Sequence, residues 1–360
     1  MPAIITDKFR IHNSEQFHEA FSESSGNTMY LGIGRPQAFA TSTRADSRTN
    51  NEGSDVSPVT PADNVNAQFY PFDDLLAAKK ITSSDVTFAI PRRNWTTGTT
   101  YDIYRHDYGE RITGTTTNQT ANSGATTLHD SSFYVLTAAR NVYKVLDNDG
   151  NTASTVEPTG TSTAILSTAD GYKWKYMYTL SASQQANFLS TDFMAVSTNS
   201  TVASAAVDGA LDIVKIKTAG SGGADGTHTN IDIRGDGTGG KVSVTVTSGA
   251  VTAVTVTTPG TGYTFGTISN AQIVAAGATS LTGAELDVII EPKGGHGKNA
   301  VEELGGFYVM LNTSLEGTES SNTSDFTVAN DFRKIALIRD PQSGGSAAVS
   351  YTHLTLPTKA

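Results

Sequence analysis

The 360-residue sequence contains no cysteine. This excludes a disulfide framework, a thiolate zinc site, a thiol nucleophile and an iron–sulfur cluster. Long apolar runs are missing as well, since none approaches the ~20 residues of a membrane span. Residues 1–13 hold no apolar block typical of a signal peptide. We therefore expect a soluble protein that has no cleaved export signal. Packing and assembly, instead of disulfides, would stabilise it.

Charge is scarce, and positive charge is scarcer than negative charge. Charged residues make up 17% of the chain, and 25 Lys and Arg stand against 35 Asp and Glu, a formal net charge of −10. Such a chain lacks the basic footprint that follows nucleic-acid phosphates or anionic lipid. We therefore predict that neither nucleic acid nor a membrane is a partner. Thr, Ser, Asn and Gly replace the missing charges, which favours strands and turns.

Only a few short helices are expected. Asn13 and Gln16 form a capping box ahead of a helix on which Phe17 and Phe21 share a face. Residues 73–80 begin with acids and end with lysines, an order that the helix dipole favours, and they predict a second short helix. Strands are predicted at residues 28–33 and 86–90, and a hairpin at residues 133–137 and 142–146.

Residues 36–66 are polar, rich in Ser, Thr, Asn and Pro, and show no apolar period. A segment of this length without its own secondary structure is usually functional. We interpret it as a long polar arm. Two alternatives stay open for it: an arm that wraps a partner or becomes ordered on assembly, and a mobile surface loop.

The clearest strand covers residues 172–180. Tyr172, Trp174, Tyr176 and Tyr178 alternate with mostly polar residues, so they are predicted to share one face of the strand. A core aromatic face of a sandwich is the first interpretation of this pattern. A platform on which a ligand stacks is the second.

Residues 208–290 are poor in charge and aromatics and dense in Gly, Thr and Val. Residues 214–222 (VKIKTAGSG) superpose on residues 254–262 (VTVTTPGTG) with a 40-residue shift, and residues 225–227 then fall on residues 265–267. Between the copies, residues 241–247 and 251–257 alternate around a turn, which predicts a hairpin. We interpret residues 208–290 as an inserted Gly/Thr-rich β domain.

The predicted fold is mainly β, a multi-domain, β-sandwich-like architecture. Residues 1–207 form the N-terminal domain, residues 208–290 the insert, and residues 291–349 the return to the main domain. Residues 350–360 (SYTHLTLPTKA) resemble translated sequencing-adapter sequence. We expect this tail to be non-native and the natural chain to continue beyond residue 349.

No catalytic constellation is visible in the sequence. Residues 235–240 (GDGTGG) match a dinucleotide-binding pattern, but a strand instead of a helix is predicted to follow them. Adjacent acids such as Glu302 and Glu303 point apart and cannot flank one bond. Residues 294–298 can either cradle an anion with backbone amides or serve as a flexible connection. We predict no enzyme, no catalytic, cofactor-binding or metal site, no cofactor and no small-molecule substrate.

Arg92, Arg93 and Trp95 follow a predicted strand end. Arg and Trp are enriched among residues that dominate protein interfaces, so these three are candidate protein-interface residues. Solvated charges at a sheet edge are the competing interpretation.

Several segments, taken in order, resemble the peripheral baseplate wedge subunit of T-even-type contractile-tailed phages. They are residues 6–10 (TDKFR), 30–35 (YLGIGR), 90–95 (IPRRNW) and 170–178 (DGYKWKYMY). Residues 291–299 (EPKGGHGKN) and 331–339 (DFRKIALIR) are similar to marine cyanophage versions of that subunit. The Gly-rich insert and residues 350–360 depart from the family pattern.

The resemblance implies a β-rich structural virion protein that forms a homodimer and joins other baseplate wedge proteins. Its location would be the tail baseplate of the virion, after assembly in the host bacterial cytoplasm. The alternative is a host-surface glycan recognition module of a tail adhesin or fibre, based on the aromatic strand and the Gly-rich turns. A glycan depolymerase ranks third, because it needs a carboxylate pair that the spacing does not show.

Overall fold

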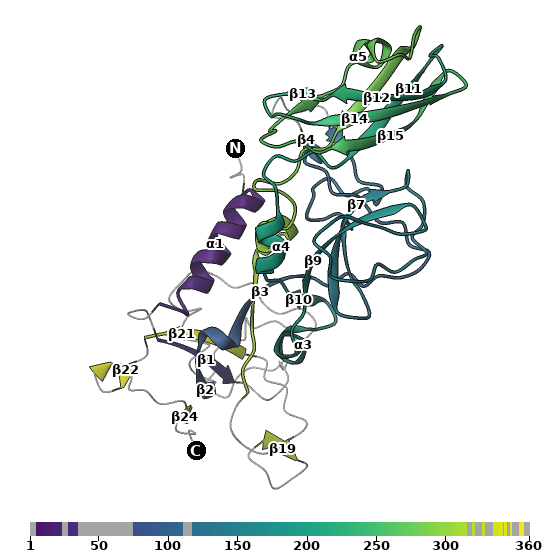
Figure 1. Ribbon diagram of the computed structural model, residues 1–360. Coiled ribbons are helices and arrows are strands. Elements are labelled where there is room, and N and C mark those ends of the chain that lie inside the picture. Colours follow the sequence, from purple (N-terminus) through teal and green to yellow (C-terminus); the bar gives the residue numbers. More distant parts are fainter. Residues whose placement is uncertain are drawn as a thin grey trace. The chain divides into compact units, whose positions relative to one another are not determined.

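The computed structural model describes residues 5–23, 28–34, 75–110, 117–314, 319–320, 326–327, 334–340, 342–343, 346–347 and 353–355 (Figure 1). The chain divides into two compact units. Unit 1 contains residues 1–11 and 88–308, and unit 2 contains residues 12–87 and 309–360. Antiparallel strands dominate the described residues, which confirms the mainly β fold class. Among these residues, no helix has the length and apolarity needed to span a membrane.

Unit 2 is built around a four-stranded sheet in the order β21-β1-β2-β24. The bounds are β1 (Met29–Gly34), β2 (Leu75–Ile81), β21 (Lys334–Arg339) and β24 (His353–Thr355). The predicted strand at residues 28–33 is confirmed as β1. The helix predicted near residues 73–80 is wrong, because β2 pairs with β1 along its length and with β24 on its other edge. Strand pairing outweighs the charge order that suggested a helix.

Helix α1 (Asp7–Glu19) begins in unit 1 and ends in unit 2. The cap predicted at Asn13 is wrong, since Asn13 lies in the helix interior. Thr6 takes the capping role, because its hydroxyl accepts a hydrogen bond from the Phe9 backbone N–H at 3.3 Å. Phe17 and Phe21 do share a face, with ring centroids 5.1 Å apart.

The central sheet of unit 1 has the order β6-β7-β9-β8. Its strands are β6 (Tyr134–Leu136), β7 (Asn141–Asn148), β8 (Leu166–Ser167) and β9 (Tyr172–Thr179). The predicted hairpin is confirmed, because β6 and β7 pair with Tyr134 opposite Lys144. Side chains from β6, β7, β9, residues 101–103 and α4 (Ser200–Ala205) form one buried cluster, called here the aromatic core: Tyr101, Ile103, Val135, Tyr143, Val145, Tyr172, Trp174, Tyr176 and Val202.

A bulge at Met177 interrupts the pairing of β7 with β9. Tyr176 lies opposite Tyr143, whereas Tyr178 lies opposite Val142, so Met177 has no counterpart on β7. Because neighbouring residues of a strand point to opposite faces, the extra residue turns Tyr178 away from the face of Tyr176. The predicted single face of four aromatics is therefore divided, with Tyr178 outside the aromatic core.

Other described elements connect and extend the two units. In unit 1, β10 (Phe193–Ala195) pairs antiparallel with the end of β3 (Val86–Pro91), and β18 (Tyr308–Leu311) leads the chain into unit 2. The remaining short elements are η1 (Ser83–Asp85), β4 (Gly109–Glu110), β5 (Thr117–Gln119), α3 (Ala182–Phe188), α6 (Ala300–Leu304), β19 (Glu319–Ser320), β20 (Phe326–Thr327), β22 (Gln342–Ser343) and β23 (Ser346–Ala347).

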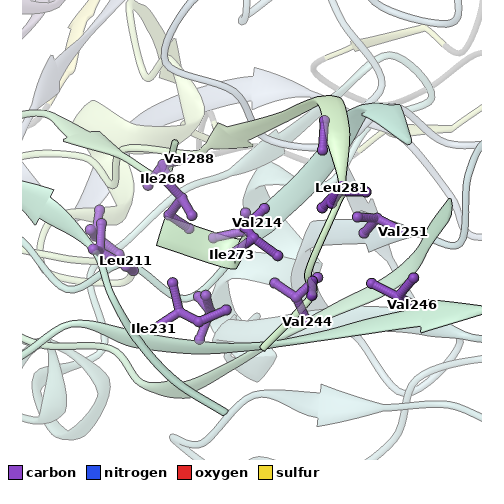
Figure 2. Close-up of a cluster of buried hydrophobic side chains, with 14 of the residues drawn as sticks. Leu211, Val214, Ile231, Val244, Val246, Val251, Ile268, Ile273, Leu281 and Val288 are labelled. Atoms are coloured by element: carbon purple, nitrogen blue, oxygen red, sulfur yellow. The ribbon is translucent and has the colours of Figure 1, made fainter. Parts of the chain in front are cut away.

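The Gly/Thr-rich insert lies in unit 1 and has its own hydrophobic cluster, called here the insert core. Its elements are β11 (Val214–Ser221), β12 (Gly226–Asp232), β13 (Arg234–Gly235), β14 (Lys241–Thr247), β15 (Ala250–Thr258), β16 (Gly266–Thr267), α5 (Asn270–Ala275) and β17 (Thr282–Val288). Figure 2 shows Val214 of β11, Val244 of β14 and Ile273 of α5 among side chains that face a shared interior. All fully buried members of this cluster come from residues 211–288.

The 40-residue repeat is visible in the backbone. Gly220 and Gly260 have φ of 69° and 70°, and Gly222 and Gly262 have φ of 77° and 75°. β11 of the first copy pairs with β17, and β15, which contains the start of the second copy, pairs with β14; both partner strands lie outside the matching segments. Two hydrogen bonds are related by the 40-residue shift: the Gly223 N–H donates to the Gly249 carbonyl, and the Tyr263 N–H donates to the Gly209 carbonyl.

The predicted domain limits at residues 207 and 290 remain a prediction, because the division into two units follows other boundaries. The polar arm at residues 36–66 lies outside the described residues. So does most of the predicted non-native tail, of which only residues 353–355 are described, in β24.

Candidate functional site

The candidate interface residues lie just after β3. The Arg92 side chain is half-buried, and its Nη1 donates to the Ser190 carbonyl at 2.8 Å while its Nε donates to Asn94 Oδ1 at 2.9 Å. Arg93 Nη2 donates to the carbonyls of His129 and Asp130 at 3.3 and 3.2 Å. Both guanidinium groups therefore hold neighbouring loops in place, and both residues are partly exposed, although Arg93 Nε is buried.

Trp95 joins this segment to the aromatic core. Its ring packs against the core, and its Nε1 donates to the Ser154 hydroxyl at 3.1 Å. The Arg93 guanidinium lies 5.3 Å from the centre of the Tyr134 ring, a cation–π distance. The three candidates thus share one stretch of chain, with the two arginines directed at loops and the tryptophan at the core.

Residues near the start of α1 lie close to Arg93 through His129. Sequence analysis did not single them out as candidate site residues. The His129 Nδ1 lies 2.8 Å from Asp7 Oδ2, and Arg93 bonds the carbonyl of that histidine. The Arg10 guanidinium lies 3.6 Å from the centre of the Phe307 ring. Asp7 and Arg10 fall in the TDKFR segment. The family resemblance of that segment is the sequence feature that could have pointed to them.

The aromatic strand is buried. Trp174 is 0% exposed, stacks on Tyr172 with centroids 5.2 Å apart, and donates from Nε1 to the Thr168 hydroxyl at 3.0 Å. The Tyr172 hydroxyl donates to the Thr152 carbonyl at 2.6 Å, and the Tyr178 hydroxyl to the Ala195 carbonyl at 2.9 Å. Burial raises the pKa of both tyrosines. No ring of the four is exposed enough to stack a ligand, so the feature that motivated a glycan-binding module is absent from this strand.

The glycine loop at residues 294–298 does hold an anion, and that anion belongs to the chain itself. The Glu303 carboxylate of α6 accepts hydrogen bonds from the Gly297 N–H at 2.8 Å and the Asn299 N–H at 3.2 Å. It also forms a buried ion pair with Lys144 of β7. The loop therefore connects α6 to the central sheet through a fully buried charge pair, whose separation would be strongly destabilising.

Potential metal ligands and the paired acids singled out by the sequence can both be placed among the described residues. No group of three or more His, Cys, Asp or Glu side chains there is placed to hold a metal ion. The paired acids Glu302 and Glu303 point apart, since Glu303 is buried and Glu302 is exposed.

Comparison with known protein families gives a match in the N-terminal part of the chain. Residues 3–137 match the family model described as Gp8 of bacteriophage T4. The matched part contains β1, β2, β3, the candidate residues Arg92, Arg93 and Trp95, and the segment around Asp7. No curated protein matches the chain significantly. The family match supports a structural role in a phage baseplate, of the kind a T4-type wedge protein has.

Proposed function

We propose that this chain is a non-enzymatic structural subunit of the contractile tail baseplate wedge, which joins neighbouring wedge proteins during virion assembly. The single observation that carries the proposal is the match of residues 3–137 to the T4 Gp8 family model. The ordered segments beyond residue 137 that resemble the same family support it. The subunit would act as a homodimer, assemble in the host cytoplasm and reside in the virion baseplate.

Arg92 is the candidate contact that this proposal makes testable. Its side chain lies at a strand end in the matched region and keeps part of its surface exposed. Arginine is well suited to a protein interface, because its planar guanidinium offers five donors that one partner does not exhaust. Its Nε and Nη1 donate to described residues of the chain, and the proposal assigns Nη2 to a neighbouring protein.

The test is co-expression of this chain with the other wedge proteins encoded by the same phage, followed by size-exclusion chromatography with light scattering. We expect a stable complex and a dimeric mass for the chain. Arg92→Ala should weaken the complex at least about tenfold, as interface arginines often do. Lys217→Ala, an exposed cation in the insert, is the matched control and should not. A monomer that binds none of the wedge proteins would refute the proposal.

A further inference from the structure

A cavity of about 560 Å³ lies in unit 1, between the insert and the loops that surround the central sheet. One part of its wall is apolar and includes Ile165, Val207 and Pro259. Another part carries Asp212, Glu291 and His296. Glu291 and His296 come from the EPKGGHGKN segment, and both side chains are 3% exposed. Two titratable groups are thus buried at the edge of an open volume.

The polar part of the wall carries two buried atoms without a hydrogen-bond partner, Glu291 Oε1 and His296 Nδ1. Glu291 Oε2 accepts from the His296 backbone N–H at 3.2 Å, but Oε1 receives no hydrogen bond, and the nearest ring nitrogen is 3.7 Å away. His296 Nδ1 is unpartnered too. The Asp212 carboxyl lies within hydrogen-bonding reach of Glu291, and ionised carboxylates can only accept. Lys175 also lines the cavity, where one of its three Nζ donors goes to the Thr163 carbonyl at 2.6 Å and its charge is attracted by Asp212.

Burial and neighbouring charges set the protonation states of Glu291 and His296. Burial, and then the hydrogen bond and charge of Asp212, raise the pKa of Glu291 to about 10, so this carboxyl holds a proton at neutral pH. Burial, and then the charges of Lys144 and Lys175, lower the pKa of His296, so its ring is neutral. The nearby Glu303 is already paired with Lys144. A cation brought to Glu291 can replace the shared proton.

We propose that this cavity binds a basic side chain, arginine or lysine, of a partner protein. The cationic head would donate to Glu291 and Asp212, and the aliphatic stem would lie on the apolar wall, as such stems do at interfaces. A metal ion fits less well, since no three-ligand group occurs among the described residues. The identity of the partner rests on the proposed function, because wedge proteins are the neighbours that such a subunit meets.

The first test needs only the purified chain. N-acetyl-arginine amide is titrated in, followed by NMR and by calorimetry near pH 7 in two buffers with different ionisation enthalpies. We expect saturable binding with release of about one proton, and at least ~10-fold weaker binding of the neutral isostere N-acetyl-citrulline amide. Equal binding of both compounds, or binding of maltose in their place, would overturn the proposal in favour of a site for neutral polar molecules.

The second test separates a binding role from a structural one. Glu291→Gln keeps the shape and a donor towards Asp212, so it should leave the melting temperature at pH 7 almost unchanged and weaken arginine-amide binding at least ~10-fold. Glu285→Gln, an exposed carboxylate of β17, is the control and should change neither. A large loss of stability in Glu291→Gln would mark the carboxyl as structural. Asp212→Asn repeats the binding test if that variant does not fold.

The arginine-amide binding tests and the wedge co-expression test can succeed or fail independently of each other. A chain that assembles with wedge proteins but ignores arginine amide keeps the proposed function and loses the cavity proposal. A chain that binds arginine amide but assembles with no wedge protein keeps the cavity and loses the identity of its partner.

Discussion

The aromatic core and the insert core are both enclosed by antiparallel strands, yet they are built from different side chains. The aromatic core contains Tyr101, Tyr143, Tyr172, Trp174 and Tyr176. The insert core consists of Val, Ile, Leu and Ala with Tyr263 as its one fully buried aromatic residue. Tyrosine and tryptophan side chains carry a polar group that needs a hydrogen-bond partner when buried, whereas aliphatic side chains only fill volume.

This difference decides how each region holds its loops. In the aromatic core, tyrosine and tryptophan tips bond loop groups, as Tyr172 bonds the Thr152 carbonyl and Trp174 the Thr168 hydroxyl. In the insert, glycines with positive φ make the turns, and only Tyr263 acts in the aromatic manner, donating to the Ile233 carbonyl and accepting from the Gly240 N–H. Loop order thus depends on large rings in one region and on backbone conformation in the other.

The largest expected losses of stability come from substitutions in the two cores, and they test whether the cores unfold separately. Trp174→Ala removes a fully buried ring and should cost about 3–5 kcal/mol, and Val244→Ala should cost about 2 kcal/mol because it removes less volume. Hydrogen exchange locates each loss. We expect Trp174→Ala to speed exchange in β7 and β9, and Val244→Ala to speed it in β12, β14 and β15 alone. Equal acceleration of all five strands by Val244→Ala would show that the insert is not a separate folding unit.

The next effect tests the repeat. Gly209 and Gly249 are 40 residues apart and both have positive φ, but a Cβ on Gly209 would lie 2.3 Å from the Tyr263 nitrogen, and one on Gly249 would lie 3.2 Å from the Gly222 nitrogen. Gly249→Ala should cost roughly 1–2 kcal/mol for the left-handed backbone. Gly209→Ala should cost about 1–3 kcal/mol more for the overlap. Urea unfolding of both variants measures the difference, and equal losses would contradict it.

The smallest effect concerns acid stability. Burial alone would raise the pKa of Asp102, but hydrogen bonds from Ser123 and Ser132 outweigh it and hold that pKa below its usual value. The unfolded chain therefore takes up this proton at a higher pH than the folded chain. The stabilisation is present above the ordinary aspartate pKa and is lost as pH falls through the lowered one.

Asp102→Asn should accordingly cost about 1–2 kcal/mol at pH 7 and flatten the loss of stability below pH ~4, measured by urea unfolding at several pH values. Asp236 of the insert is the comparison, since the side-chain hydrogen bond from Thr264 is the main cause that lowers its pKa to about 2 although it is exposed. Asp236→Asn should lower the free energy of unfolding less than Asp102→Asn does. A larger loss for Asp236→Asn than for Asp102→Asn would contradict this prediction.

Sequence patterns predicted the elements whose side chains alternate and whose turns carry glycine. The strand at residues 28–33, the hairpin around residues 138–141 and the repeated turns all follow from such local signals. Residues 73–80 were predicted wrongly because their charges suit a helix dipole, while their neighbours β1 and β24, distant in sequence, supply hydrogen bonds that only a strand can use. The bulge at Met177 has no local signal either, because it depends on the register with β7.

By itself the sequence determined the mainly β class, the Gly/Thr-rich repeat and the segments that resemble a baseplate wedge subunit, because composition and short-range periodicity act within a few residues. Tertiary structure alone decided the strand partners of the repeat, the enclosure of Lys144 with Glu303, and the meeting of Asp212, Glu291 and His296 at one cavity. These outcomes join residues far apart along the chain. The free energy of a buried charge depends on what surrounds it in space, and local sequence does not specify those surroundings.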